Sequence, residues 1–138
     1  MLYVGSSDKK LHALDASTGE QKWAFSTGDY VEAPVIQSGV LYIGSNGRVY
    51  ALDANTGQQK WASTIPNGLF LLSAVVNGIV YVNSQDELYA LDASTGQEKW
   101  FFSVKIDEFS GLTVLNGVVY VCSLDHKVYA LKLPPSSS

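Results

Sequence analysis

The stretch Ala51-Leu52-Asp53-Ala54-Asn55-Thr56-Gly57-Gln58-Gln59-Lys60-Trp61 decides the fold, because its pattern recurs along the chain. The pattern is Ala-x-Asp-x-x-Thr-Gly-x-x-x-Trp, and its tryptophans follow one another after 38 and then 39 residues. Fixed spacing of this kind indicates a protein built from repeated units. The three copies are Ala13, Asp15, Thr18, Gly19 and Trp23; Ala51, Asp53, Thr56, Gly57 and Trp61; and Ala90, Asp92, Thr95, Gly96 and Trp100.

A second series of residues carries the repeat beyond these three copies. Tyr3, Tyr42, Tyr81 and Tyr120 each lie in a Leu/Val-Tyr-Val/Ile run, and each follows the last after 39 residues. Such short apolar runs, separated by turn signals, predict strands. Turn dipeptides of the Asn-Gly type are a strong hairpin signal, because both residues tolerate a positive φ. A period of about 40 residues with four strands indicates a β-propeller blade.

The strand count predicts how the repeats are divided. The first copy lacks its innermost strand and the last lacks its outer, tryptophan-bearing strand, so we expect an all-β chain with blades of three, four, four and three antiparallel strands. The predicted blades span residues 1–30, 31–68, 69–108 and 109–133, and residues 134–138 form a disordered tail of linker composition. A chain that opens inside a strand is typical of a piece of a longer protein.

The three motif copies resemble the tryptophan-docking repeat of the PQQ-like β-propellers, which include quinoprotein dehydrogenases and non-enzymatic relatives. The resemblance covers residues 1 to about 133. It implies that each tryptophan lies on the motif glycine of a neighbouring blade. Independently of the family, Asp is expected to accept backbone hydrogen bonds and close the turn, and Gly to supply its positive φ. We therefore interpret the fifteen motif residues as structural.

Composition excludes several classes of function. The net charge is −4 and the nine basic residues are scattered, which argues against a nucleic-acid-binding groove. No apolar run is long enough to cross a bilayer, so we expect no membrane contact. Cys122 is the single cysteine; it can form no internal disulfide and is expected to be a small buried thiol. The chain shows no signal peptide, whereas the family resemblance suggests a periplasmic or extracellular location.

No catalytic residue, cofactor or metal site is expected. The resemblance implies that an enzymatic member would need a Cys-Cys disulfide, a set of carboxylate and amide metal ligands, and an acidic base. The chain has no Cys-Cys pair, and Glu32, Asp107 and Glu108 do not match that arrangement. His12 takes the place of a tyrosine in the other copies and is expected on a strand, whereas His126 is expected to be solvated in a turn.

Any binding site is expected to lie on one loop face. The first and third turns of each blade are nearly identical between copies, whereas the second turn and the blade-to-blade connection vary and should share the opposite face. Simple drift of unconstrained loops is the favoured explanation of this variation. The candidate residues on this face are Asp29, Tyr30, Glu32, Asn67, Phe70, Asp107, Glu108 and Phe109.

Three and a half blades fall short of the seven or eight blades typical of the family, and an open arc would expose apolar faces and strand edges. We therefore predict a homodimer that closes a seven- or eight-bladed ring about a two-fold axis, with a protein as a further partner. The favoured function is a non-catalytic binding or scaffolding module. The alternative is a fragment of a PQQ-dependent quinoprotein dehydrogenase without a complete active site.

Overall fold

The structure is a computed structural model that describes residues 1–31, 34–65, 71–84, 87–103 and 112–132. Within these ranges every regular element is a β-strand. The described residues contain no helix that is long and apolar enough to cross a bilayer. The fourteen strands form four antiparallel sheets of three, four, four and three strands. This confirms the predicted all-β class and the division of strands between the blades.

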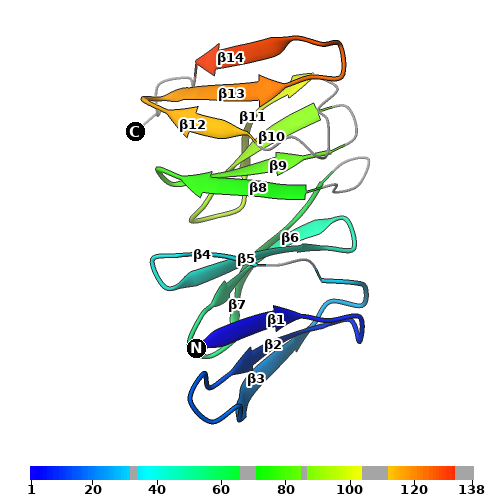
Figure 1. The fold of residues 1–138 in the computed structure, drawn as a ribbon, viewed down its shortest axis with the longest axis vertical. Coiled ribbons are helices and arrows are strands. Elements are labelled where there is room, and N and C mark those ends of the chain that lie inside the picture. Colours follow the sequence, from blue (N-terminus) through cyan, green and yellow to red (C-terminus); the bar gives the residue numbers. More distant parts are fainter. Residues whose placement is uncertain (32–33, 66–70, 85–86, 104–111, 133–138) are drawn as a thin grey trace.

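The sheets follow one another in chain order along the longest axis of the molecule (Figure 1). Sheet 1 contains β1 (Leu2–Gly5), β2 (Lys10–Leu14) and β3 (Gln21–Ser26). Sheet 2 contains β4 (Val35–Gln37), β5 (Val40–Ser45), β6 (Arg48–Asp53) and β7 (Gln59–Thr64). Sheet 3 contains β8 (Leu71–Val76), β9 (Ile79–Asn83), β10 (Glu87–Asp92) and β11 (Glu98–Ser103). Sheet 4 contains β12 (Thr113–Leu115), β13 (Val118–Cys122) and β14 (Val128–Lys132).

Tight hairpins set the register of the inner strands. Asn77 and Gly78, which join β8 to β9, have φ values of 51° and 77°, and Asn116 and Gly117 have 52° and 77°. Two successive positive φ values match the right-handed twist of the paired strands. The pairing of the third and fourth strands carries a repeated irregularity, since the register shifts directly after the motif alanine in sheets 1, 2 and 3. Sequence reasoning did not predict this bulge.

Alternating side chains on each strand build a separate core between each pair of sheets. Leu41, Ile43 and Leu52 of sheet 2 are buried against Leu11 of sheet 1. On the other side of sheet 2, Val49 and its neighbours pack with residues of sheet 3, and a third cluster joins sheets 3 and 4. Because side chains of one strand point alternately to opposite faces, sheets 2 and 3 are buried on both faces.

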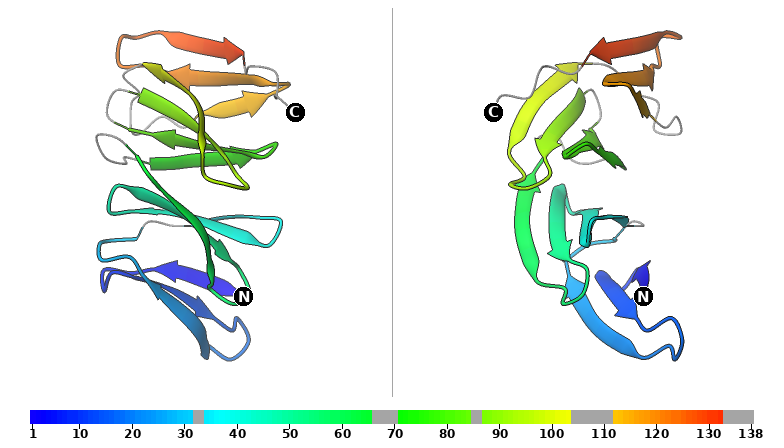
Figure 2. Two further views of the ribbon diagram at one scale, coloured as in Figure 1. Left: turned by 180° about the vertical axis from the view of Figure 1, so that it is seen from behind. Right: turned by 90° about the vertical axis from the view of Figure 1, so that its left-hand side faces the viewer.

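The stack is curved, with β3, β7 and β11 on its convex side and β4 and β8 on its concave side (Figure 2). Sheets 1 and 4 lie at opposite ends of the stack (Figure 1). One prediction fails at the fourth sheet, because Cys122 is exposed rather than buried. On β13, Val119 and Val121 face the core and alternate with Tyr120 and Cys122, whose face has no further sheet beside it among the described residues.

Candidate functional site

The motif aspartate closes the turn that follows the third strand of a blade. Asp53 Oδ1 accepts hydrogen bonds from the backbone N–H groups of Asn55 (2.8 Å) and Thr56 (3.1 Å). The Gly57 N–H donates to the Asp53 carbonyl, and the Asp53 N–H donates to the Gln58 carbonyl, both at 2.8 Å. These contacts are the Asx-type turn that the sequence predicted.

The same turn recurs in the first copy with the same distances. Asp15 Oδ1 accepts from the N–H groups of Ser17 (2.8 Å) and Thr18 (3.1 Å). The backbone hydrogen bonds from Ser17 and then Thr18 lower the pKa of Asp15, because they stabilise the ionised carboxylate. Thr18 Oγ1 in turn accepts from the Glu20 N–H (3.2 Å). Asp15 Oδ1 and Thr18 Oγ1 thus both accept hydrogen bonds within their own turn.

The motif tryptophan contacts the next sheet. Trp23 of β3 lies against Gly57, so that a Cβ atom at that glycine would be 2.5 Å from Trp23 Cε3. The Trp23 Nε1–H donates to the Ala54 carbonyl at 3.3 Å. One repeat later, Trp61 lies over Gly96, and its Nε1–H donates to the Ala93 carbonyl at 2.9 Å.

The tyrosine series makes a parallel set of contacts that sequence reasoning missed. The Tyr3 hydroxyl donates to the Ala54 carbonyl (2.8 Å), and the Tyr42 hydroxyl donates to the Ala93 carbonyl (3.4 Å), each 51 residues further along the chain. Tyr42 also lies 6.1 Å from Trp61 between ring centroids. Burial raises the pKa of Tyr42. The 39-residue spacing was the available signal, but it marked only the register and not a bond between sheets.

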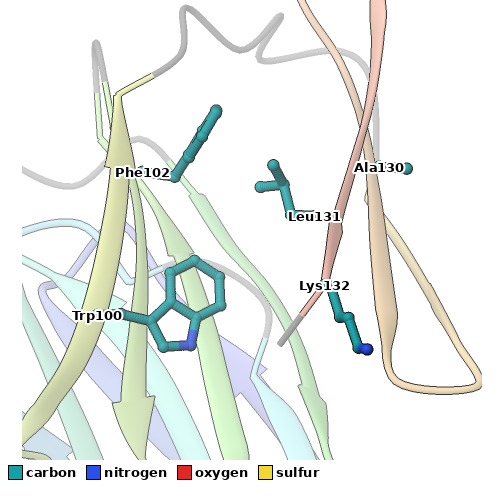
Figure 3. Close-up of a pocket in the computed structure, with 5 residues that line it drawn as sticks. All are labelled: Trp100, Phe102, Ala130, Leu131 and Lys132. Carbon is teal, nitrogen blue, oxygen red and sulfur yellow. The ribbon is translucent and has the colours of Figure 1, made fainter. Parts of the chain in front are cut away.

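The contact between sheets 3 and 4 departs from this pattern. Lys132 stands where the other copies have the motif aspartate. The buried Nε1 of Trp100 has no hydrogen-bond partner among the described residues. A cavity of about 350 Å³ lies here, and in Figure 3 Trp100 and Phe102 of β11 point toward Leu131 of β14. Its lining residues are Trp100, Phe102, Ala130, Leu131 and Lys132.

The predicted loop face is built around a small polar network. The hydroxyls of Thr27 and Ser45 lie 2.7 Å apart, and Ser45 Oγ–H donates to the Tyr30 carbonyl at 2.8 Å. Both hydroxyls are buried, and they hold the connection after β3 against the second turn of sheet 2. This places the two kinds of variable segment on one face at sheets 1 and 2. Thr27 and Ser45 were not among the candidate residues, and no repeated pattern marked them.

Two of the eight candidate residues on this face lie within the described residues. Asp29 is exposed, and its Oδ1 accepts from the Tyr30 N–H at 2.7 Å. The Tyr30 side chain is 59% exposed. The other candidates lie outside the described residues: Glu32, Asn67, Phe70, Asp107, Glu108 and Phe109.

The two histidines lie at the second turns of the end sheets: His12 bonds to the turn between β1 and β2, and His126 lies in the turn between β13 and β14. His12 lies on β2, as predicted, with Nδ1 2.7 Å from Gln21 Oε1 and Nε2 2.8 Å from Asp8 Oδ2. The hydrogen bonds to Gln21 and then Asp8 raise the pKa of His12. His126 is exposed in a turn. Within the described ranges, no three His, Cys, Asp or Glu residues gather in a way that could hold a metal ion.

Over residues 1–76 and 45–133 the sequence matches the family described as outer membrane protein assembly factor BamB, a family of PQQ-like repeats. The chain belongs to this PQQ-like β-propeller family. The resemblance that the motif indicated is therefore confirmed. Among curated protein sequences there is no match.

Solved structures place the chain among the PQQ-like propellers in fold as well. BamB from Moraxella catarrhalis is 25% identical, with a TM-score of 0.77 over 95% of this chain and 42% of that chain. A quinohemoprotein alcohol dehydrogenase from Comamonas testosteroni is 27% identical, with a TM-score of 0.61 over 74% of this chain and 19% of that one. The computationally designed Ika4 protein, at 17% identity, shares the fold with a TM-score of 0.81 over 96% and 84%. The chain thus spans less than half the length of the BamB structure.

Proposed function

We propose that this PQQ-like propeller chain is a non-catalytic binding or scaffolding module that completes a ring by self-association. The observation that carries the proposal is that the repeated motif residues make contacts within and between the sheets. Asp53 closes a turn, Gly57 receives the ring of Trp23, and Trp61 bonds to the Ala93 carbonyl of the next sheet. These contacts support a structural docking role for the motif and leave recognition to the loops that vary.

The variable loop face is the proposed binding surface. Tyr30 is an exposed aromatic side chain there, and the buried pair Thr27 and Ser45 fixes the backbone that presents it. Exposed aromatic residues on a rigid frame are typical of protein interfaces. The description of the matching family contains the words assembly factor, which also favours a protein as the partner of this face.

The second candidate function is that of a quinoprotein dehydrogenase fragment. It is favoured by the 27% identity to the quinohemoprotein alcohol dehydrogenase. In this case the chain would form some of the blades of a dehydrogenase but not a complete active site.

Titration with pyrroloquinoline quinone and Ca²⁺ tests whether the chain carries any part of a quinone site. A binding or scaffolding module should show neither a shift in the unfolding midpoint nor a change in quinone absorbance. Saturable binding with a raised midpoint would overturn the non-catalytic proposal and favour the dehydrogenase fragment.

The loop face itself can be tested with a photo-crosslinking amino acid in the source cells. At position 30 it should yield a discrete protein adduct. At position 56, in the repeated turn of sheet 2 at the other end of the strands, it should yield none. Equal adducts at both positions would remove the loop face as the binding surface.

A further inference from the structure

The two end sheets each leave one apolar face uncovered within the described chain. In sheet 1 the register sets Leu2 opposite Leu14 and Val4 opposite His12, so these four residues share one face, here called the N-face. In sheet 4, Tyr120 stands opposite Ala130 and Cys122 opposite Val128, and these four residues form the C-face. Sheets 1 and 4 lie at opposite ends of the stack (Figure 1).

Exposure along the C-face is abnormal for this repeat. Tyr120 is 40% exposed and Val128 is 69% exposed. Their counterparts one repeat earlier, Tyr81 and Leu88, are both 0% exposed, because sheet 4 covers them. The C-face is thus built like an internal blade face, with an apolar surface that lacks its cover.

The N-face shows the same discrepancy. Leu2 is 53% exposed and Val4 is 39% exposed, whereas their counterparts in sheet 2, Leu41 and Ile43, are fully buried. His12 is its one polar member, and its ring is already hydrogen-bonded to Asp8 and Gln21.

The N-face and the C-face correspond to the two opposite faces that pack together between neighbouring sheets inside the chain. Between sheets 2 and 3, a face of the C-face type, with Tyr42 and Val49, packs on a face of the N-face type, with Val80 and Val82. Within the described residues a C-face counterpart always meets an N-face counterpart, since the cores between sheets 1 and 2 and between sheets 3 and 4 follow the same order. One chain therefore carries, at its two ends, both halves of its own internal interface.

We propose that a second copy of this chain covers these faces head to tail, the C-face of each copy packing on the N-face of the other. This inference rests on the self-association in the proposed function, and it identifies the C-face and the N-face as the surfaces that associate. Two such contacts close about a two-fold axis. Sheets 1 and 4 are two separate sheets and not two halves of one sheet. Each chain therefore contributes four sheets, and the closed ring of two chains has eight sheets.

A specific hydrogen bond follows from the internal interfaces. Tyr3 and Tyr42 donate to Ala54 and Ala93, the residues directly after the motif aspartates. The tyrosine of the C-face is Tyr120, and the residue after the first motif aspartate is Ala16. In the ring, the Tyr120 hydroxyl of one copy donates to the Ala16 carbonyl of the other.

Light scattering after size exclusion, over a wide range of concentration, tests the ring. The parent chain should have twice its mass of 14.9 kDa. Leu2→Glu on the N-face and Val128→Glu on the C-face should each give monomers, because burying an unpaired charge in an apolar interface is strongly unfavourable. Ile36→Glu is the matched control: Ile36 is an apolar residue, 54% exposed on β4 and outside both faces, so this variant should remain dimeric. Circular dichroism of each variant checks that the fold is kept.

Mixing the two disrupted variants tests the head-to-tail orientation. A mixture of Leu2→Glu and Val128→Glu retains one intact contact, between the unaltered C-face of the first and the unaltered N-face of the second, and should recover heterodimers. Contacts between like faces would recover none. Tyr120→Phe should weaken dimerisation several-fold while the chain stays folded.

Three results would overturn the inference: a monomeric parent chain at every concentration, a dimer unaffected by Leu2→Glu, or an open series of larger assemblies. The quinone titration is independent of them. A monomer that binds no quinone removes only the ring, whereas a ring that binds quinone removes only the non-catalytic function.

Discussion

At the scale of single residues, two glycines in the same motif position occupy different surroundings. Gly19 and Gly57 have φ values of 76° and 77°, and each follows the motif threonine. The ring of Trp23 lies over Gly57, whereas no described atom lies within 4 Å of a Cβ placed on Gly19. The pair therefore separates the conformational role of glycine from its role as a surface for tryptophan.

Gly57→Ala should destabilise the chain more than Gly19→Ala. Both substitutions place alanine at a positive φ, at a cost of about 1–2 kcal/mol. Gly57→Ala adds a clash with Trp23, worth about 1–3 kcal/mol more. Chemical unfolding of both variants measures the difference. Equal losses of stability would show that the tryptophan contact contributes nothing.

The roles of the motif aspartate and glycine were predictable at this scale because they are local and repeat. The exposure of Cys122 was not, because burial of a strand residue depends on whether another sheet covers its face. The bonds from the tyrosines to alanine carbonyls were missed for a similar reason, since each joins residues 51 apart in two different sheets.

At the scale of elements, the motif turns depend on ionised carboxylates. Backbone hydrogen bonds from Asn55 and then Thr56 lower the pKa of Asp53 from its ordinary value of 3.8, and Asp15 behaves in the same way. A carboxyl group whose pKa is lower in the folded state stabilises the fold above its unfolded pKa. That stabilisation is lost as the pH falls through the lowered, folded-state pKa.

The free energy of unfolding should therefore decline as the pH is reduced below about 4. Asp15→Asn combined with Asp53→Asn should flatten this decline, because the amide oxygen still accepts hydrogen bonds but no longer titrates. Urea unfolding at a series of pH values measures the effect. Glu20→Gln changes an exposed side chain beside the same turn and should keep the parental pH dependence. A decline that persists unchanged in the double variant would assign it to other groups.

Strand number and hairpin positions were predictable because dipeptides such as Asn77-Gly78 carry their own backbone preference. The register shift after each motif alanine was not, because it arises in the pairing of two strands. The position of the loop face was predictable from the variable turns. The hydrogen bond between the hydroxyls of Thr27 and Ser45 was not, because it joins two segments that meet only in the folded chain.

At the scale of the whole molecule, the sheets differ in how far they are covered. β9 and β13 are equivalent strands, yet Tyr81 on β9 is fully buried, whereas Tyr120 on β13 is 40% exposed. The end sheets should consequently open more readily than the middle ones in a monomer.

Hydrogen exchange should show this gradient and its removal on assembly. In the Leu2→Glu monomer, amides of β13 should exchange faster than those of β9. In the concentrated parent chain, the rates of the two strands should converge as the C-face becomes covered. Hydrogen exchange of the Leu2→Glu monomer and of the concentrated parent chain, followed by mass spectrometry, provides the measurement. A gradient that is identical in both samples would contradict ring closure.

The tyrosine bonds give the chain a direction. The hydroxyls of Tyr3 and Tyr42 each reach forward to the following sheet, across 51 residues in a repeat of 39, so neither sheet holds both ends of the bond. Duplicating or deleting one whole period after Tyr3 would therefore still leave Tyr3 with an alanine carbonyl in the sheet ahead of it. Chains of this type can change length by whole blades at little structural cost, and growth by duplication within the gene is compatible with the fold at each step.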